Sequence, residues 1–153
     1  VHAAIAGTGS EQEITTEITN PDVPRNASVK ATNVGPPSGS VKITGINDKG
    51  ISSEEDITII PNDTAYGNVA WSTISKITVP AGVTSNDSVT IGMSDKLGLG
   101  VSIVNAGDVF KKKINNEDKS GEISGNVDTT YDTLNCETIA SNADLTIWFK
   151  GRV

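Results

Sequence analysis

The feature that most constrains the fold of this chain is a short alternation of β-branched and polar side chains, repeated between turn signals. The stretch SVKITGINDKGISSEEDITII, residues 40–60, shows it twice, on either side of an Asn-Asp-Lys-Gly turn. The alternating apolar residues there are Val41, Ile43, Ile57 and Ile59. Turn residues recur about every eight to twelve positions along the chain, a spacing typical of antiparallel sandwiches and barrels.

The apolar composition favours strands over helices. Isoleucine and valine total 31 residues, whereas leucine contributes 4. β-Branched side chains are stiff at χ1 and fit a pleated, half-buried surface. We therefore expect an all-β protein, an antiparallel β-sandwich or barrel with an extended terminal arm. The predicted strands are 13–19, 27–34, 40–46, 54–60, 69–79 and 87–95, then two strands within 101–115 and one in each of 122–128, 130–140 and 144–153.

The length suits one domain with a flexible end. A chain of 153 residues can bury a core without a disulfide or a metal. Residues 1–12 are small and polar and include Gly7 and Gly9, which predicts a flexible N-terminal arm. Residues 13–153 are predicted to form a single β domain. The alternation changes phase near Ser72, which indicates a β-bulge or a short turn in that strand.

The net charge and the lengths of the apolar runs argue against two classes of partner. Lysine and arginine total 12 and aspartate and glutamate total 19, giving a net charge of −7. A nucleic-acid partner is not expected, because such proteins neutralise phosphates with clustered cations. A membrane partner is not expected either, because no apolar run is long enough to cross a bilayer.

The acidic turn region 45–56 does not fit a calcium loop. With Gly50 at the glycine position of an EF-hand loop, Gly45 and Lys49 stand where oxygen ligands are required. The stretch is therefore interpreted as a hairpin in which Gly50 takes the left-handed turn conformation. Glu54, Glu55 and Asp56 are interpreted as a solvated strand edge that discourages sheet addition.

No catalytic, cofactor or metal residue is predicted. The single histidine, His2, lies in the predicted arm, where it makes a poor base for a serine or cysteine nucleophile. The single cysteine, Cys136, excludes a disulfide framework and a cysteine zinc site, and is interpreted as a small buried residue. Acids are plentiful enough for a glycosidase pair, but aromatic residues are scarce for a sugar groove. We expect no enzyme.

A few residues are predicted to make contacts with partners. Lys111 and Lys113 belong to the only basic run, whose side chains alternate faces on a strand. Trp148 and Phe149 point to opposite faces, so one is expected in the core and the other at an interface. The predicted interface residues are His2, Ile5, Lys111, Lys113 and Trp148, the first two through an arm that orders on docking.

Several segments resemble small virion proteins of tailed phages and related viruses. The segments are a hairpin, an acidic strand, a Trp/Ile/Pro segment and a KLGL segment, at Val41–Gly50, Glu54–Ile60, Trp71–Pro80 and Val89–Leu99. The resemblance lies within residues 40–100. It implies a capsid decoration or cement protein that binds a major capsid protein on the outer surface of the virion, as a homo-oligomer and most naturally a trimer. It supplies no catalytic residues.

Two alternatives remain beside this hypothesis. A tail or head–tail connector protein fits the same β-rich, acidic composition. A cell-surface adhesin or carbohydrate-binding β-sandwich module predicts exposed aromatic residues along a groove. An enzyme would instead show a deep cleft with converging polar groups.

Overall fold

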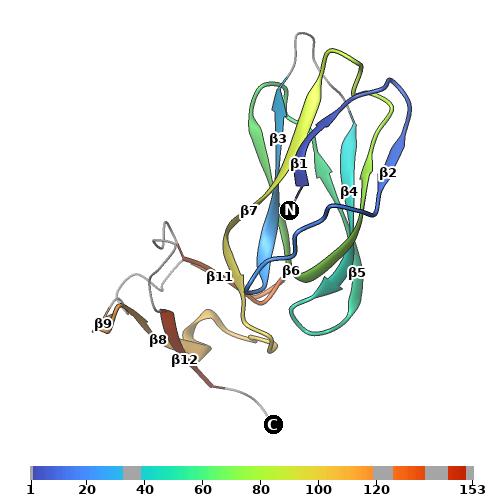
Figure 1. Cartoon of the computed structure of the whole chain (residues 1–153). Helices are drawn as coiled ribbons and strands as arrows, with labels where there is room; N and C mark the ends of the chain where they lie inside the picture. The colour runs from blue at the N-terminus through green and yellow to red at the C-terminus, as the bar shows by residue number, and fades with distance from the viewer. Residues whose placement is uncertain (1, 33–38, 119–125, 137–144, 151–153) are drawn as a thin grey trace.

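The computed structural model describes residues 2–32, 39–118, 126–136 and 145–150, and it confirms the predicted all-β fold. The main antiparallel sheet curls into a half-barrel (Figure 1). It contains β1 (His2–Ala6), β2 (Gln12–Ile14), β3 (Arg25–Thr32), β4 (Ser40–Asn47), β5 (Ser52–Thr58), β6 (Thr64–Val79), β7 (Ser88–Gly98), β10 (Val127–Asp128) and β11 (Thr133–Asn135). A smaller sheet contains β8 (Val109–Ile114), β9 (Glu117–Asp118) and β12 (Leu145–Phe149).

The long strand β6 organises the main sheet. Its first half pairs with β3 and its second half pairs with β4. The two partners meet opposite Trp71, which is in register with Arg25 on one side and Asn47 on the other. The β4–β6 register skips Ser72, so the bulge predicted there is confirmed. The opposite edge of the first half of β6 has no ladder partner among the described strands.

The predicted alternation places the core. Odd-numbered residues of β4 and β5 are the less exposed ones, because strand side chains alternate faces, and Val41, Ile43 and Ile57 among them are buried. Trp71 is fully buried at the centre. The remaining buried apolar residues of this core are Ile5, Ala27, Val29, Ala31, Ile59, Ala65, Ile74, Ile77, Val79, Val83, Val89 and Ile91.

The prediction of a flexible arm over residues 1–12 is wrong. Residues His2–Ala6 form β1, which pairs with β7, and the side chain of Ile5 is only 5% exposed in the main core. The backbone N–H of Gly7 donates to the carbonyl of Asp87 at 3.0 Å. A Cβ on Gly7 would lie 2.4 Å from the Val83 carbonyl oxygen, so this glycine permits close packing and does not provide flexibility.

The C-terminal part differs from expectation in one strand. Within 101–115 only β8 forms, and the predicted first strand is absent from residues 101–105. The short 3₁₀ segment Ala106–Asp108 then leads into β8. The predicted strands 122–128, 130–140 and 144–153 lie partly outside the described residues, and their described parts contain β10, β11 and β12. A second apolar cluster joins the end of β7 to these strands. Its buried members are Ile103, Val109, Leu134 and Cys136.

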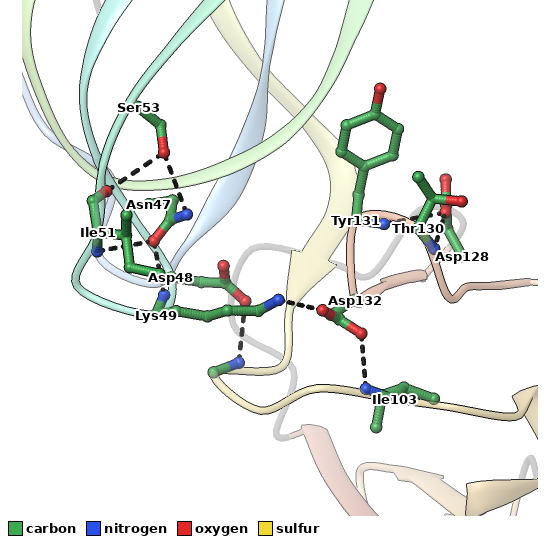
Figure 2. A network of polar contacts seen from close by, with 11 residues as sticks. Asn47, Asp48, Lys49, Ile51, Ser53, Ile103, Asp128, Thr130, Tyr131 and Asp132 are labelled. Atoms are coloured by element: carbon green, nitrogen blue, oxygen red, sulfur yellow. Dashed lines mark hydrogen bonds and ion pairs between the residues drawn. The ribbon is translucent and has the colours of Figure 1, made fainter.

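The β4–β5 hairpin reaches this second cluster (Figure 2). The predicted hairpin is confirmed, with Gly50 at φ 76° in the turn. Lys49, at its tip, forms an ion pair with the buried carboxylate of Asp132, which also accepts from the N–H of Ile103 at 2.6 Å. Asp48 accepts from the N–H of Gly100 at 2.9 Å. These contacts tie the turn to the segment that follows β7.

Candidate functional site

The small sheet presents an outward face that combines one aromatic ring with two cations. In β12, Ile147 and Phe149 pack against the second apolar cluster, whereas Trp148 points outward and is 37% exposed. The predicted placement of Trp148 and Phe149 on opposite faces is therefore confirmed, and the interface role of the outward residue stays a prediction. Directly paired residues share a face, so Lys111, the ladder partner of Trp148, also lies on the outward side.

The two lysines of this face lie close to the indole ring. The Nζ atoms of Lys111 and Lys113 are 5.3 and 5.9 Å from the ring centroid of Trp148. Each such contact contributes about 0.5–1 kcal/mol at an exposed site. The pair also holds positive charge over an exposed ring on a chain whose net charge is −7. We call Lys111, Lys113 and Trp148 the Trp148 face.

The five predicted interface residues do not form one surface. Lys111, Lys113 and Trp148 come together, as described. His2 and Ile5 lie instead on β1 in the main sheet (Figure 1). Ile5 is buried, which overturns its prediction as a contact residue, because its side chain is already covered by this chain's own core. His2 is half-buried, with Nδ1 2.8 Å from the carbonyl oxygen of Ala3.

The acidic strand contains a carboxylate whose role was not predicted. Glu54 and Asp56 are exposed, as expected of a solvated edge. Glu55 is half-buried and accepts from the N–H of Asn68 at 2.5 Å and of Val69 at 3.3 Å. The interpretation of Glu55 as solvated was therefore wrong. The signal was available, because Glu55 is in phase with Ile57 and so falls on the inner face.

The electrostatics of Glu55 follow from its position. Burial raises the pKa of the Glu55 carboxyl, while the N–H groups of Asn68 and Val69 and the charge of Lys96 oppose that rise. Along the edge of β6 that has no ladder partner, the Glu55 carboxylate accepts the backbone hydrogen bonds that the carbonyl groups of a neighbouring strand would otherwise accept. Gly67 makes this approach possible, because a Cβ there would lie 2.4 Å from Glu55 Oε2. Glu55 is therefore a group that holds two strands together.

No three histidine, cysteine, aspartate or glutamate side chains of the described residues converge to hold a metal ion. Cys136 is buried in the second cluster, as predicted for a small apolar residue. No helix in the described ranges has the length and apolar character needed to cross a bilayer.

Comparisons of the chain with protein-family models, with curated proteins and with solved structures found no match. The class of protein that the fold defines is therefore an all-β protein built on a half-barrel. Any narrower assignment depends on the residues of its surfaces. Among the described residues, the Trp148 face and the region around Tyr66 both combine an exposed aromatic ring with charged neighbours.

Proposed function

We propose that this chain is a structural protein of a viral particle, a decoration or cement protein that binds the outer surface of a shell made of a major capsid protein. The proposal is supported by the hairpin, acidic-strand and KLGL segments within residues 40–100, which resemble small virion proteins of tailed phages. A rigid half-barrel with a separate small contact sheet suits such a role. The protein acts in this proposal by contact, without a chemical step.

The observation that carries the proposal is the Trp148 face. A partly exposed tryptophan is the kind of side chain that anchors protein interfaces, and this one has two lysine Nζ atoms at 5.3 and 5.9 Å from its ring centroid. The two lysines direct this face toward an acidic patch, because opposite potentials favour docking and orientation. We therefore place the shell contact at Lys111, Lys113 and Trp148, against acidic residues of the capsid surface.

Multivalency compensates for the small size of this face. One exposed indole with two lysines supplies a modest affinity by itself. A trimer carrying three such faces binds a lattice of repeated sites with a much lower apparent Kd, because the second and third contacts are intramolecular. The proposed partner set is thus two further copies of this chain and the major capsid protein.

The test combines particle composition with variant binding. Purified particles are analysed by mass spectrometry for this chain, and shells lacking it are titrated with wild type, Trp148→Ala, and the double variant Lys111→Glu with Lys113→Glu. Both variants should lose decoration. Tyr131→Ala is the matched control, because Tyr131 is 39% exposed, close to the 37% of Trp148.

Two results would contradict the proposal. Absence of the chain from purified particles removes the virion role. Full decoration by Trp148→Ala and by the charge-reversed variant removes the proposed contact. Recovery of the chain only with isolated tails would assign it to the tail or the connector instead of the shell.

A further inference from the structure

Three adjoining hollows on the main sheet share their lining residues. The first encloses about 270 Å³ and is lined by Asn26, Tyr66, Ser94, Asp95, Lys96 and Asn135. The second, of about 400 Å³, shares Lys96 and Asn135 and extends along 126–129. The third, of about 490 Å³, shares Tyr66 and lies between β5 and the start of β6. The first hollow adjoins each of the other two through these shared residues, and we call the three together the Tyr66 trough.

The floor of the Tyr66 trough is held by a polar network. Asn26 is 1% exposed, and its amide donates to the carbonyl of Gly67 at 2.7 Å and accepts from the N–H of Lys96 at 3.0 Å. One buried side chain thereby joins β3, β6 and β7. Lys96 Nζ donates to Asn68 at 2.6 Å and lies 3.8 Å from Asp128. The polar groups of the trough are therefore positioned before any ligand arrives.

Tyr66 supplies an aromatic surface at the junction of two hollows. Its side chain is 62% exposed, the largest exposed fraction among the large apolar residues that the structure describes as exposed. It projects from the ladder between β3 and β6, in register with Ser28. A tyrosine on a strand loses little conformational entropy on binding and presents both an apolar ring face and a hydroxyl.

The charges of the trough select the class of ligand. Its lining contains the carboxylates of Glu55, Asp56, Asp95 and Asp128 against the single ammonium of Lys96. This excess of negative charge disfavours phosphate, sulfate and acidic polymers. A metal cation is also disfavoured, because no three acidic, histidine or cysteine side chains of the described residues converge. Two of the four carboxylates are also engaged, Glu55 by backbone N–H groups and Asp128 by Lys96 and the N–H groups of Thr130 and Tyr131.

We propose that the Tyr66 trough binds a neutral oligosaccharide. Sugar hydroxyls both donate and accept hydrogen bonds, so they match a hollow whose lining residues include both a lysine, Lys96, and an aspartate, Asp95. The apolar C–H face of a pyranose ring packs on the exposed ring of Tyr66. The length of the trough, with hollows on both sides of the central one, suits a chain of several sugars.

The binding test uses probes that differ in charge and linkage. The full chain is titrated by calorimetry and by ¹H–¹⁵N NMR with β-1,4, β-1,3 and α-1,4 glucose hexamers and with a neutral N-acetylglucosamine hexamer. A cationic glucosamine hexamer and an anionic galacturonate hexamer complete the set. At least one neutral probe should bind with a Kd of about 1 mM or tighter and shift the amide signals of Asn68 and Lys96.

Variants locate the site. Tyr66→Ala should weaken binding of the neutral probe about tenfold or more, Tyr66→Phe should retain most of it, and Asp95→Asn should weaken it. Tyr131→Ala is the control, because Tyr131 is exposed but does not line the trough. Thermal unfolding of each variant separates lost binding from lost folding.

Three outcomes would overturn this inference. They are no binding of any neutral probe at about 10 mM, binding of the charged probes alone, and unchanged affinity in Tyr66→Ala. The inference does not rest on the virion role. Sugar binding is measured on the isolated chain, whereas decoration is measured on particles, so the failure of either leaves the other standing.

Discussion

Replacing Glu55 with alanine tests how the first half of β6 is stabilised along the edge that has no ladder partner. The change removes the acceptor of two backbone N–H groups, those of Asn68 at 2.5 Å and Val69 at 3.3 Å. Each buried N–H without an acceptor costs about 1–3 kcal/mol. Two effects offset part of this cost. The variant no longer has to bury a carboxylate, and water can hydrogen-bond to the N–H of Val69. We expect the free energy of unfolding to fall by about 2 kcal/mol, and Tm by about 4–8 °C.

The assay is urea unfolding of wild type, Glu55→Ala, Glu55→Gln and Glu54→Ala in parallel. Glu55→Gln keeps one acceptor oxygen and should lose less stability than the alanine variant. Glu54→Ala is the matched control, because its side chain is 59% exposed and forms only a 3.5 Å ion pair with Lys42. That pair is worth about 0.5 kcal/mol or less. If Glu55→Ala and Glu54→Ala unfold at the same urea concentration, the reasoning about β6 is wrong.

The pH dependence of the same comparison has a defined sign. Burial raises the pKa of Glu55 above its ordinary value of 4.5, so the folded chain binds this proton more readily than the unfolded chain does. Stability of wild type relative to Glu55→Gln should therefore increase as the pH falls through the raised pKa, and level off below the unfolded value. A relative stability that falls on acidification would contradict the burial argument.

Three further predictions concern other contacts. Deleting residues 2–6 should lower the free energy of unfolding by at least about 2 kcal/mol in urea, because a buried isoleucine and a sheet strand are lost; unchanged stability would restore the flexible-arm hypothesis. Gly67→Ala should destabilise the chain, and less so when combined with Glu55→Ala, since the clash is between these two positions; additive losses would argue against it. Asp132→Ala should speed hydrogen exchange at the Ile103 amide; unchanged exchange would show that this bond protects nothing.

Much of the main sheet could be predicted from local pattern. The alternation of Val41 and Ile43 identified the inner face of β4, and the phase change near Ser72 identified the bulge. Both features depend only on residues close together in the sequence, because the two-residue alternation of side chains is set by the backbone of a single strand. Strand ends were less accurate. The strand expected at 13–19, for example, is reduced to Gln12–Ile14.

The candidate sites were predictable only in part. Lys111, Lys113 and Trp148 were singled out as separate residues, and the pairing of β8 with β12 brought them to one face. Nothing local related Tyr66 to Lys96 or to Asn135, which lie on three different strands. The strand alternation that predicts Ile57 to be buried predicts the same for Glu55. The sequence does not show which groups an acidic side chain on the inner face would contact, because they belong to β6.

By itself, the order of residues determined that this protein is all-β, where its hairpin at Asn47–Gly50 turns, and which side of each long strand is apolar. The tertiary structure alone decided that residues His2–Ala6 are a sheet strand, that Lys49 meets Asp132, and that two hollows meet at Tyr66. The physical reason is the distance along the chain over which each kind of interaction acts. Pleat and turn geometry act between adjacent residues, whereas these contacts close loops of tens of residues, and many closures satisfy the same local pattern.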